Sequence, residues 1–149
     1  MKILTVRQPW AWSIIYAGKD VENRSTNIAG SYRGLVAIHA GLKNNKESWR
    51  LFQDSAPNAA DLEEKILAAS VYGSIIGVVD LIDVHTSAGA QCASGSGEYP
   101  CSPWALASEK YHLVLARPRS IEPIPYKGFL GLRSITDEEI IASIKKQLA

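Results

Sequence analysis

The most strand-like segment of the chain is SIIGVVDLIDV, residues 74–84. It is rich in isoleucine and valine, whose branched side chains favour strands, and its apolar run is nearly continuous. A strand with one face in water alternates apolar and polar side chains, whereas a nearly continuous apolar run is typical of a strand covered on both faces. We therefore expect residues 74–84 to form the central strand of a sheet.

Further strands and helices are predicted on either side of this segment. Strands are expected at residues 3–6, 21–25, 35–40, 111–116 and 129–134, with a turn containing Pro118, Pro123 and Pro125 between the last two. Helices are expected from Gln8-Pro9 to Gly18, at 45–54, at 59–69 and from Thr136, where Thr136-Asp137-Glu138-Glu139 matches a capping box.

The order of these elements predicts an α+β fold built on a small curved or closed sheet. A length of 149 residues corresponds to one domain, and we expect residues 1–135 to form its core with the inserted helices and 136–149 a C-terminal helix. The composition, 46% hydrophobic and 21% charged, excludes a disordered or fibrous chain. No apolar run is long enough to span a membrane and no signal-type stretch follows Met1-Lys2, which predicts a cytoplasmic protein without a membrane partner.

The charges are distributed unevenly along the chain. Residues 1–50 carry a net charge of +5, residues 51–109 one of −7, and residues 110–149 one of +3. If the two ends meet in the fold, they form a basic face able to bind phosphate groups; the alternative is a pair of ordinary solvated surfaces. Asp80 and Asp83 interrupt the apolar central strand, and we expect them to pair with the basic ends because an unpaired buried carboxylate is costly.

The two cysteines, Cys92 and Cys101, lie in one polar stretch and lack the CxxC spacing that zinc and redox motifs share. We interpret them as free loop thiols and assign no metal and no cofactor. A metal site that combines them with His85 or His112 stays open as the alternative. The surrounding segment from Ser87 to Ser102 is rich in Gly, Ser and Ala without periodicity, and we expect a mobile flap over a binding site.

Five stretches of the chain resemble the activating signal cointegrator homology (ASCH) family. They are LTVRQPWAWSIIYAGKDVENRS (4–25), YRGLVAIHA (32–40), GSIIGVVDLIDV (73–84), SPW (102–104) and PRSIEPIPYKGFLGLR (118–133). The most specific piece is GKDVENR, residues 18–24, which carries the family's Gly, Lys, Glu and Arg motif. The resemblance implies a mixed β-barrel similar to the PUA domains that bind RNA, with flanking and inserted helices. It also implies a pocket near residues 18–24 and a link to nucleic-acid binding or to hydrolysis of RNA or modified nucleosides.

The residues themselves also predict a site at this motif. Lys19 follows the helix-ending Gly18, while Glu22 and Arg24 are two positions apart and share one face of an extended strand. Arg24 offers two donors to a phosphate, Lys19 a point charge, and Glu22 an acceptor for the amino group of a base. The alternative is an internal ion-pair network that only stabilises the barrel.

Other candidates surround these three residues. Two aromatic side chains able to stack on a base are assigned different positions. Trp10 is predicted to lie in the core, because it belongs to the apolar face of the helix expected before Gly18. Trp104 comes just after Ser102-Pro103, at the end of the long loop, and is predicted to line the pocket. We assign ligand binding to Arg24, Lys43, Ser102 and Trp104 and, if the protein is an enzyme, catalysis to Lys19, Glu22 and Tyr32.

Two function classes follow. The first is a binding module for RNA, single-stranded nucleic acid or a nucleotide. The second is a hydrolase in which Lys19 acts as an acid or base, either a ribonuclease or an amidohydrolase of modified nucleosides. Amidohydrolases that act on acetylated cytidine resemble this motif but carry threonine where this chain has Glu22. A protein-recruiting scaffold would need an exposed apolar patch, which the sequence does not identify.

Overall fold

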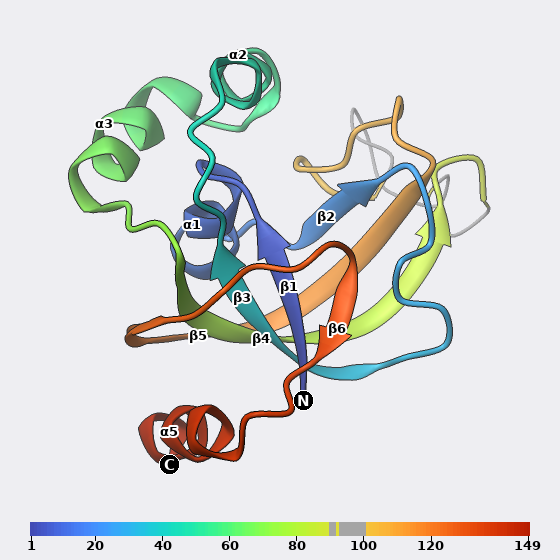
Figure 1. The fold of residues 1–149 in the computed structure, drawn as a ribbon. Helices are drawn as coiled ribbons and strands as arrows, with labels where there is room; N and C mark the ends of the chain where they lie inside the picture. The colour runs from blue at the N-terminus through green and yellow to red at the C-terminus, as the bar shows by residue number, and fades with distance from the viewer. Residues whose placement is uncertain (90–91, 93–100) are drawn as a thin grey trace.

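The predicted central strand lies in the middle of a curved, mixed sheet (Figure 1). The structure is a computed structural model that describes residues 1–89, 92 and 101–149. The sheet has the strand order β2-β5-β4-β3-β1-β6, with β1 and β3 parallel and the other neighbours antiparallel. Its strands are β1 (Lys2–Val6), β2 (Val21–Arg24), β3 (Gly34–Ala40), β4 (Ser74–Thr86), β5 (Tyr111–Pro125) and β6 (Leu132–Ser134).

The helices of the described residues cover both sides of this sheet. They are α1 (Trp10–Tyr16), α2 (Lys46–Ser55), α3 (Ala59–Ala69) and α5 (Glu138–Leu148). In Figure 1, α2 and α3 lie at one end of the molecule and α5 at the opposite end. Among the residues that the structure describes, none of the helices has the length and apolar character needed to cross a membrane.

Both faces of β4 are buried over residues 74–81, as the apolar run predicts, whereas Ile82 in the second part of the strand is 48% exposed. Ile76 and Val79 belong to a core cluster shared with α1, whereas Ile75 and Val78 belong to a cluster closed by α5. The α1 side is packed so closely that a Cβ atom on Gly77 would lie 2.5 Å from a methyl carbon of Ile15. Glycine at this position therefore lets α1 approach the sheet.

The predicted turn between residues 116 and 129 is wrong, because the strand before it extends through most of this segment. β5 continues through Pro118 and Pro123 to Pro125, and pairs with β4 through several register shifts. Its other neighbour, β2, pairs only with residues 111–114, so the proline-containing half of β5 has a free edge among the described strands. Proline is tolerated at a sheet edge, because its missing N–H breaks no ladder hydrogen bond there.

The start of the last helix also differs from the prediction. Asp137, not Thr136, is the N-cap residue of α5, and its carboxylate accepts hydrogen bonds from the amides of Glu139 and Ile140. An aspartate at this position satisfies two amides that have no partner within the helix and places a negative charge at its N-terminus.

The predicted pairing of the strand carboxylates with the basic ends is confirmed. Asp80 forms ion pairs with Arg117 and Arg119 of β5, and Asp83 lies 3.8 Å from Arg33. Of the predicted flap at residues 87–102, residues 90–91 and 93–100 lie outside the described residues.

Candidate functional site

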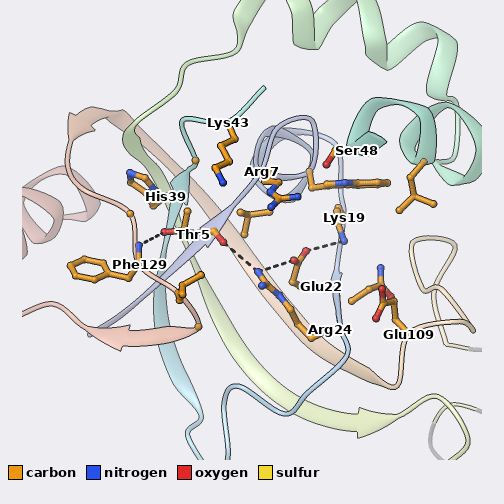
Figure 2. A pocket seen from close by; sticks show the side chains of 18 of the residues that line it. Thr5, Arg7, Lys19, Glu22, Arg24, His39, Lys43, Ser48, Glu109 and Phe129 are labelled. Carbon is orange, nitrogen blue, oxygen red and sulfur yellow. Dashed lines mark hydrogen bonds and ion pairs between the residues drawn. The ribbon is translucent and has the colours of Figure 1, made fainter. Parts of the chain in front are cut away.

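A cleft of about 730 Å³ opens beside the ends of β1, β2 and β3 (Figure 2). Helices α1 and α2 form one side of it, and residues 128–131, which precede β6, form another. The motif at residues 18–24 contributes Lys19, Glu22, Asn23 and Arg24 to its lining. The cleft thus borders the motif near which the resemblance implies a pocket.

Lys19 is the most deeply buried charge of the cleft, with 1% of its side chain exposed. Gly18, at φ 73°, turns the chain out of α1 in a conformation that glycine adopts readily, and thereby directs Lys19 inward. The Lys19 amine donates to the carbonyl of Val21, lies 3.4 Å from a carboxylate oxygen of Glu22 and sits 5.4 Å from the ring centre of Trp10. Burial lowers the pKa of Lys19 below its usual 10.5, although the charge of Glu22 acts in the opposite direction.

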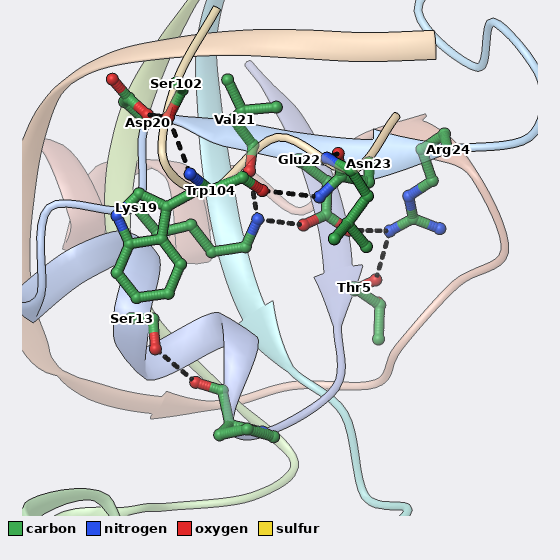
Figure 3. Close-up of polar contacts among 12 residues, drawn as sticks. Thr5, Ser13, Lys19, Asp20, Val21, Glu22, Asn23, Arg24, Ser102 and Trp104 are labelled. Carbon is green, nitrogen blue, oxygen red and sulfur yellow. Dashed lines mark hydrogen bonds and ion pairs between the residues drawn. The ribbon is translucent and has the colours of Figure 1, made fainter. Parts of the chain in front are cut away.

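Glu22 links Lys19 to Arg24, as Figure 3 shows. Its second carboxylate oxygen lies 3.1 Å from a terminal nitrogen of Arg24, which also donates to the carbonyl of Thr5. The Nε atom of Arg24 is buried and has no hydrogen-bond partner among the described residues. The Arg24 side chain is 27% exposed, so its remaining N–H groups can donate hydrogen bonds to a bound anion.

Two further cations stand in the same cleft. Arg7 and Lys43 are exposed, and Figure 2 shows their side chains above β1 and beside α1. Neither forms an ion pair with any residue that the structure describes. With Lys19 and Arg24 they give four positive side chains against the two carboxylates of Glu22 and Glu109, a net charge of +2.

His39 lies at the other end of the cleft, on β3 (Figure 2). Its Nε2 atom donates to the carbonyl of Tyr126 over 2.8 Å, and its Nδ1 atom is buried without a partner in the described part of the chain. Burial lowers the pKa of His39, so the ring is neutral at pH 7 and its Nδ1 atom is an acceptor. A Cβ atom on Gly128 would lie 3.1 Å from His39, which explains why this close passage of the chain is made by glycine.

Three predicted site residues do not line the cleft. The hydroxyl of Tyr32 donates to the carbonyl of Leu35, and its ring packs against the core. Ser102 donates to the carboxylate of Asp20 and accepts from the amide of Trp104. The third residue, Trp104, stands beside Ser102 in a segment held against β2, where its carbonyl accepts from the side chain of Asn23.

The two tryptophans do not divide between core and cleft as predicted. Trp104 is 8% exposed and packs in a cluster with Phe52 of α2 and Ile66 of α3, because these inserted helices cover it. Trp10, predicted as core, does pack against the core, but it is only partly buried and also lines the cleft under Lys19. Helical periodicity assigned Trp10 to the inner stripe but carries no information about which part of that stripe borders the cleft.

The cleft also contains side chains that sequence analysis did not single out. Arg7 and Phe129 line it, and both stand inside stretches quoted for the resemblance, LTVRQPW and KGFLGLR. The amide of Phe129 donates to the hydroxyl of Thr5 over 2.9 Å, which fixes the 128–131 segment over the end of β1. Gly128 and Gly131 were the sequence feature that could have predicted a turn in this segment.

Comparison with solved structures identifies the fold. A mutant form of the ASCH protein of Zymomonas mobilis has a TM-score of 0.55 to this chain at 15% sequence identity, covering 97% of this chain and 96% of that one. The crystal structure of the ASCH protein itself has a TM-score of 0.51 at 14% identity, covering 94% and 90%. The chain therefore has the ASCH fold, and the expected α+β, PUA-like architecture is confirmed. No family model and no curated protein matches the chain.

Proposed function

We propose that this chain, with its ASCH fold, binds RNA, another single-stranded nucleic acid or a nucleotide in the cleft around Lys19, Glu22 and Arg24. The observation that carries the proposal is the net charge of +2 in a cleft where Arg7, Lys43 and Arg24 keep donors free among the described residues. Phosphate groups supply the matching negative charge. The other lining residues are largely apolar and aromatic, which suits a sugar and a base.

The size of the cleft favours one splayed nucleotide over a duplex. A volume of about 730 Å³ lies within the range of sites for small organic ligands, roughly 300–1,000 Å³. Proteins that read single-stranded RNA hold unstacked bases in such pockets and leave the rest of the backbone on the surface. In this arrangement Arg24 and Lys43 bind phosphate, and Glu22 accepts a hydrogen bond from an amino group of the base.

The test is fluorescence anisotropy of a labelled single-stranded RNA across a salt series. Affinity should fall with rising salt, because cations of the cleft displace counterions from phosphate. Arg24→Ala should weaken binding by about 1–3 kcal/mol, roughly 5- to 150-fold. Lys146→Ala is the matched control: it removes one positive charge from an exposed position of α5, a helix that contributes no residue to the cleft.

Binding that does not respond to salt would contradict phosphate recognition. Equal losses in Arg24→Ala and Lys146→Ala would show that only the overall charge matters, and would place the contact outside the cleft.

A second candidate function is hydrolysis of RNA or of a modified nucleoside. The observation that favours it is the lowered pKa of Lys19, since a lysine serves as a general base only when its amine is neutral in part of the population. The amine is buried next to Glu22 and Trp10 at the wall of the cleft. Chromatography of RNA and nucleoside digests tests this candidate: turnover should occur with the wild type and be lost in Lys19→Met, while RNA affinity changes less than in Arg24→Ala.

We further propose that the protein acts in the cytoplasm, because Cys92 and Cys101 form no disulfide and reduced thiols persist in that compartment.

A further inference from the structure

Four metal-binding side chains meet outside the cleft, at the end of the β4–β5 hairpin. The antiparallel register places His85 of β4 directly opposite His112 of β5, and the two ring centres are 5.4 Å apart. Cys92 and Cys101 join them from the connection between the two strands. One ligand atom from each of the four residues lies within 4.8 Å of the other three.

The orientation of His112 is that of a metal ligand. Its Nε2 atom donates to the carbonyl of Leu106 over 2.8 Å, so the lone pair of the neutral ring is on Nδ1. This Nδ1 atom points between the two sulfur atoms, 3.4 Å from that of Cys92 and 3.5 Å from that of Cys101. Histidines that bind metals typically donate their other N–H to a backbone carbonyl or a carboxylate in this way.

His85 supplies a second buried ring to the cluster. Its side chain is 5% exposed, and its Nε2 atom is buried without a hydrogen-bond partner among the described residues. The Nδ1 atom lies 3.8 Å from a carboxylate oxygen of Asp83, which is beyond hydrogen-bond distance, so the ring has a carboxylate neighbour but no fixed outer partner. A buried nitrogen without a hydrogen-bond partner destabilises the fold, and a bound cation removes that cost.

Hydrogen bonds within the cluster cannot satisfy all four of these side chains. The Nδ1 lone pair of His112 can accept one thiol proton, either from Cys92 or from Cys101. The other thiol can hydrogen-bond to the first sulfur, but the buried Nε2 atom of His85 is left without a partner among the described residues. A cation that accepts all four lone pairs satisfies every member at once.

We propose that His85, Cys92, Cys101 and His112 bind a structural Zn²⁺ ion. Zinc is typically bound tetrahedrally by two thiolates and two imidazoles, and two thiolates neutralise its charge, which suits a buried site. With Zn–S near 2.3 Å and Zn–N near 2.0 Å, tetrahedral geometry puts neighbouring sulfur and nitrogen ligands roughly 3.5 Å apart. The separations of 3.4 and 3.5 Å at His112 match this geometry before any adjustment.

The ion holds one wall of the cleft. Leu106, whose carbonyl orients His112, lines the cleft together with Glu109. Leu106 also donates its amide to Asn23, the cleft residue between Glu22 and Arg24. Four protein ligands leave no open coordination position, so the ion is structural and takes no part in a reaction.

The experiment uses the untagged full chain, purified under reducing conditions. Elemental analysis should find one zinc per chain, and X-ray absorption should find two sulfur ligands at about 2.3 Å and two nitrogen ligands at about 2.0 Å. Cys92→Ser and Cys101→Ser should each lose most of the zinc. His39→Ala is the matched control and should keep it, because His39 is the remaining histidine of the chain and lies in the cleft.

Two further measurements keep the proposal testable if the cysteine variants fail to fold. Chelation of the wild type should lower its melting temperature, and added zinc should restore it. Cobalt in place of zinc should give the absorption bands of a tetrahedral site with thiolate ligands.

A wild-type protein that neither contains zinc nor takes it up when reduced would overturn the proposal. The same holds for zinc bound through oxygen and nitrogen atoms alone, or for full zinc content in both cysteine variants. None of these outcomes depends on nucleic-acid binding.

Discussion

Replacing Lys19 by methionine tests whether the charge cluster of the cleft exists for binding or for stability. Lys19 is 1% exposed, and its pKa is lowered, so the cost of burying its charge exceeds the attraction of Glu22. Methionine fills a similar volume without a charge, and Glu22 keeps its ion pair with Arg24. Because buried ion pairs are often no better than apolar replacements, we expect the free energy of unfolding at pH 7 to fall by less than about 1 kcal/mol, or to rise.

Glu22→Gln is the informative comparison. It leaves the buried ammonium of Lys19 without its carboxylate, a change that costs about 3–5 kcal/mol when one partner of a buried pair is removed. Both variants are measured by urea denaturation, with the midpoint compared at constant slope. If Lys19→Met costs as much as Glu22→Gln, then Lys19 is a stabilising partner, and the argument for a binding role is wrong.

The pH dependence provides a second readout on the same pair. Between the lowered pKa of folded Lys19 and its usual 10.5, the unfolded chain binds more protons than the folded one. The contribution of Lys19 to the free energy of unfolding therefore rises with pH through this window. Lys19→Met should lack that rise, so the difference between wild type and variant should shift in favour of the wild type as the pH approaches 10.5.

Three more predictions concern the frame around the site. Gly77→Ala should destabilise the fold by about 1–3 kcal/mol in urea denaturation, because its Cβ atom would lie 2.5 Å from Ile15; an unchanged midpoint would show that α1 is free to move. Burial raises the pKa of Asp80, but the hydrogen bonds from its two arginines outweigh this and hold it below 3.8. Asp80→Asn should therefore cost stability at pH 7 and progressively less as the pH falls below 3.8, and an equal cost in acid would exclude the ion pairs as its cause. Asp137→Ala should cost about 0.5–2 kcal/mol by thermal melting while Thr136→Ala costs less, and the reverse order would restore the capping box to Thr136.

Much of the cleft could be predicted from the sequence because its main residues are neighbours in the chain. Lys19, Glu22 and Arg24 converge because a glycine ends α1 and a short strand places alternate residues on one face. Lys43, which the sequence analysis assigned to ligand binding, lines the same cleft. The remaining assignments, to Tyr32, Ser102 and Trp104, depended on how distant segments pack, which local patterns do not contain.

The sequence by itself determined the central strand and its burial, since a nearly continuous apolar run is stable only when both faces are covered. Tertiary structure alone decided which tryptophan borders the cleft, because α2 and α3 cover Trp104 and leave Trp10 at the edge. It also decided the meeting of two cysteines and two histidines, which are separated along the chain by six, eight and ten residues. That spacing matches no local motif, because the β4–β5 register, set by hydrogen bonds across the sheet, places His85 against His112.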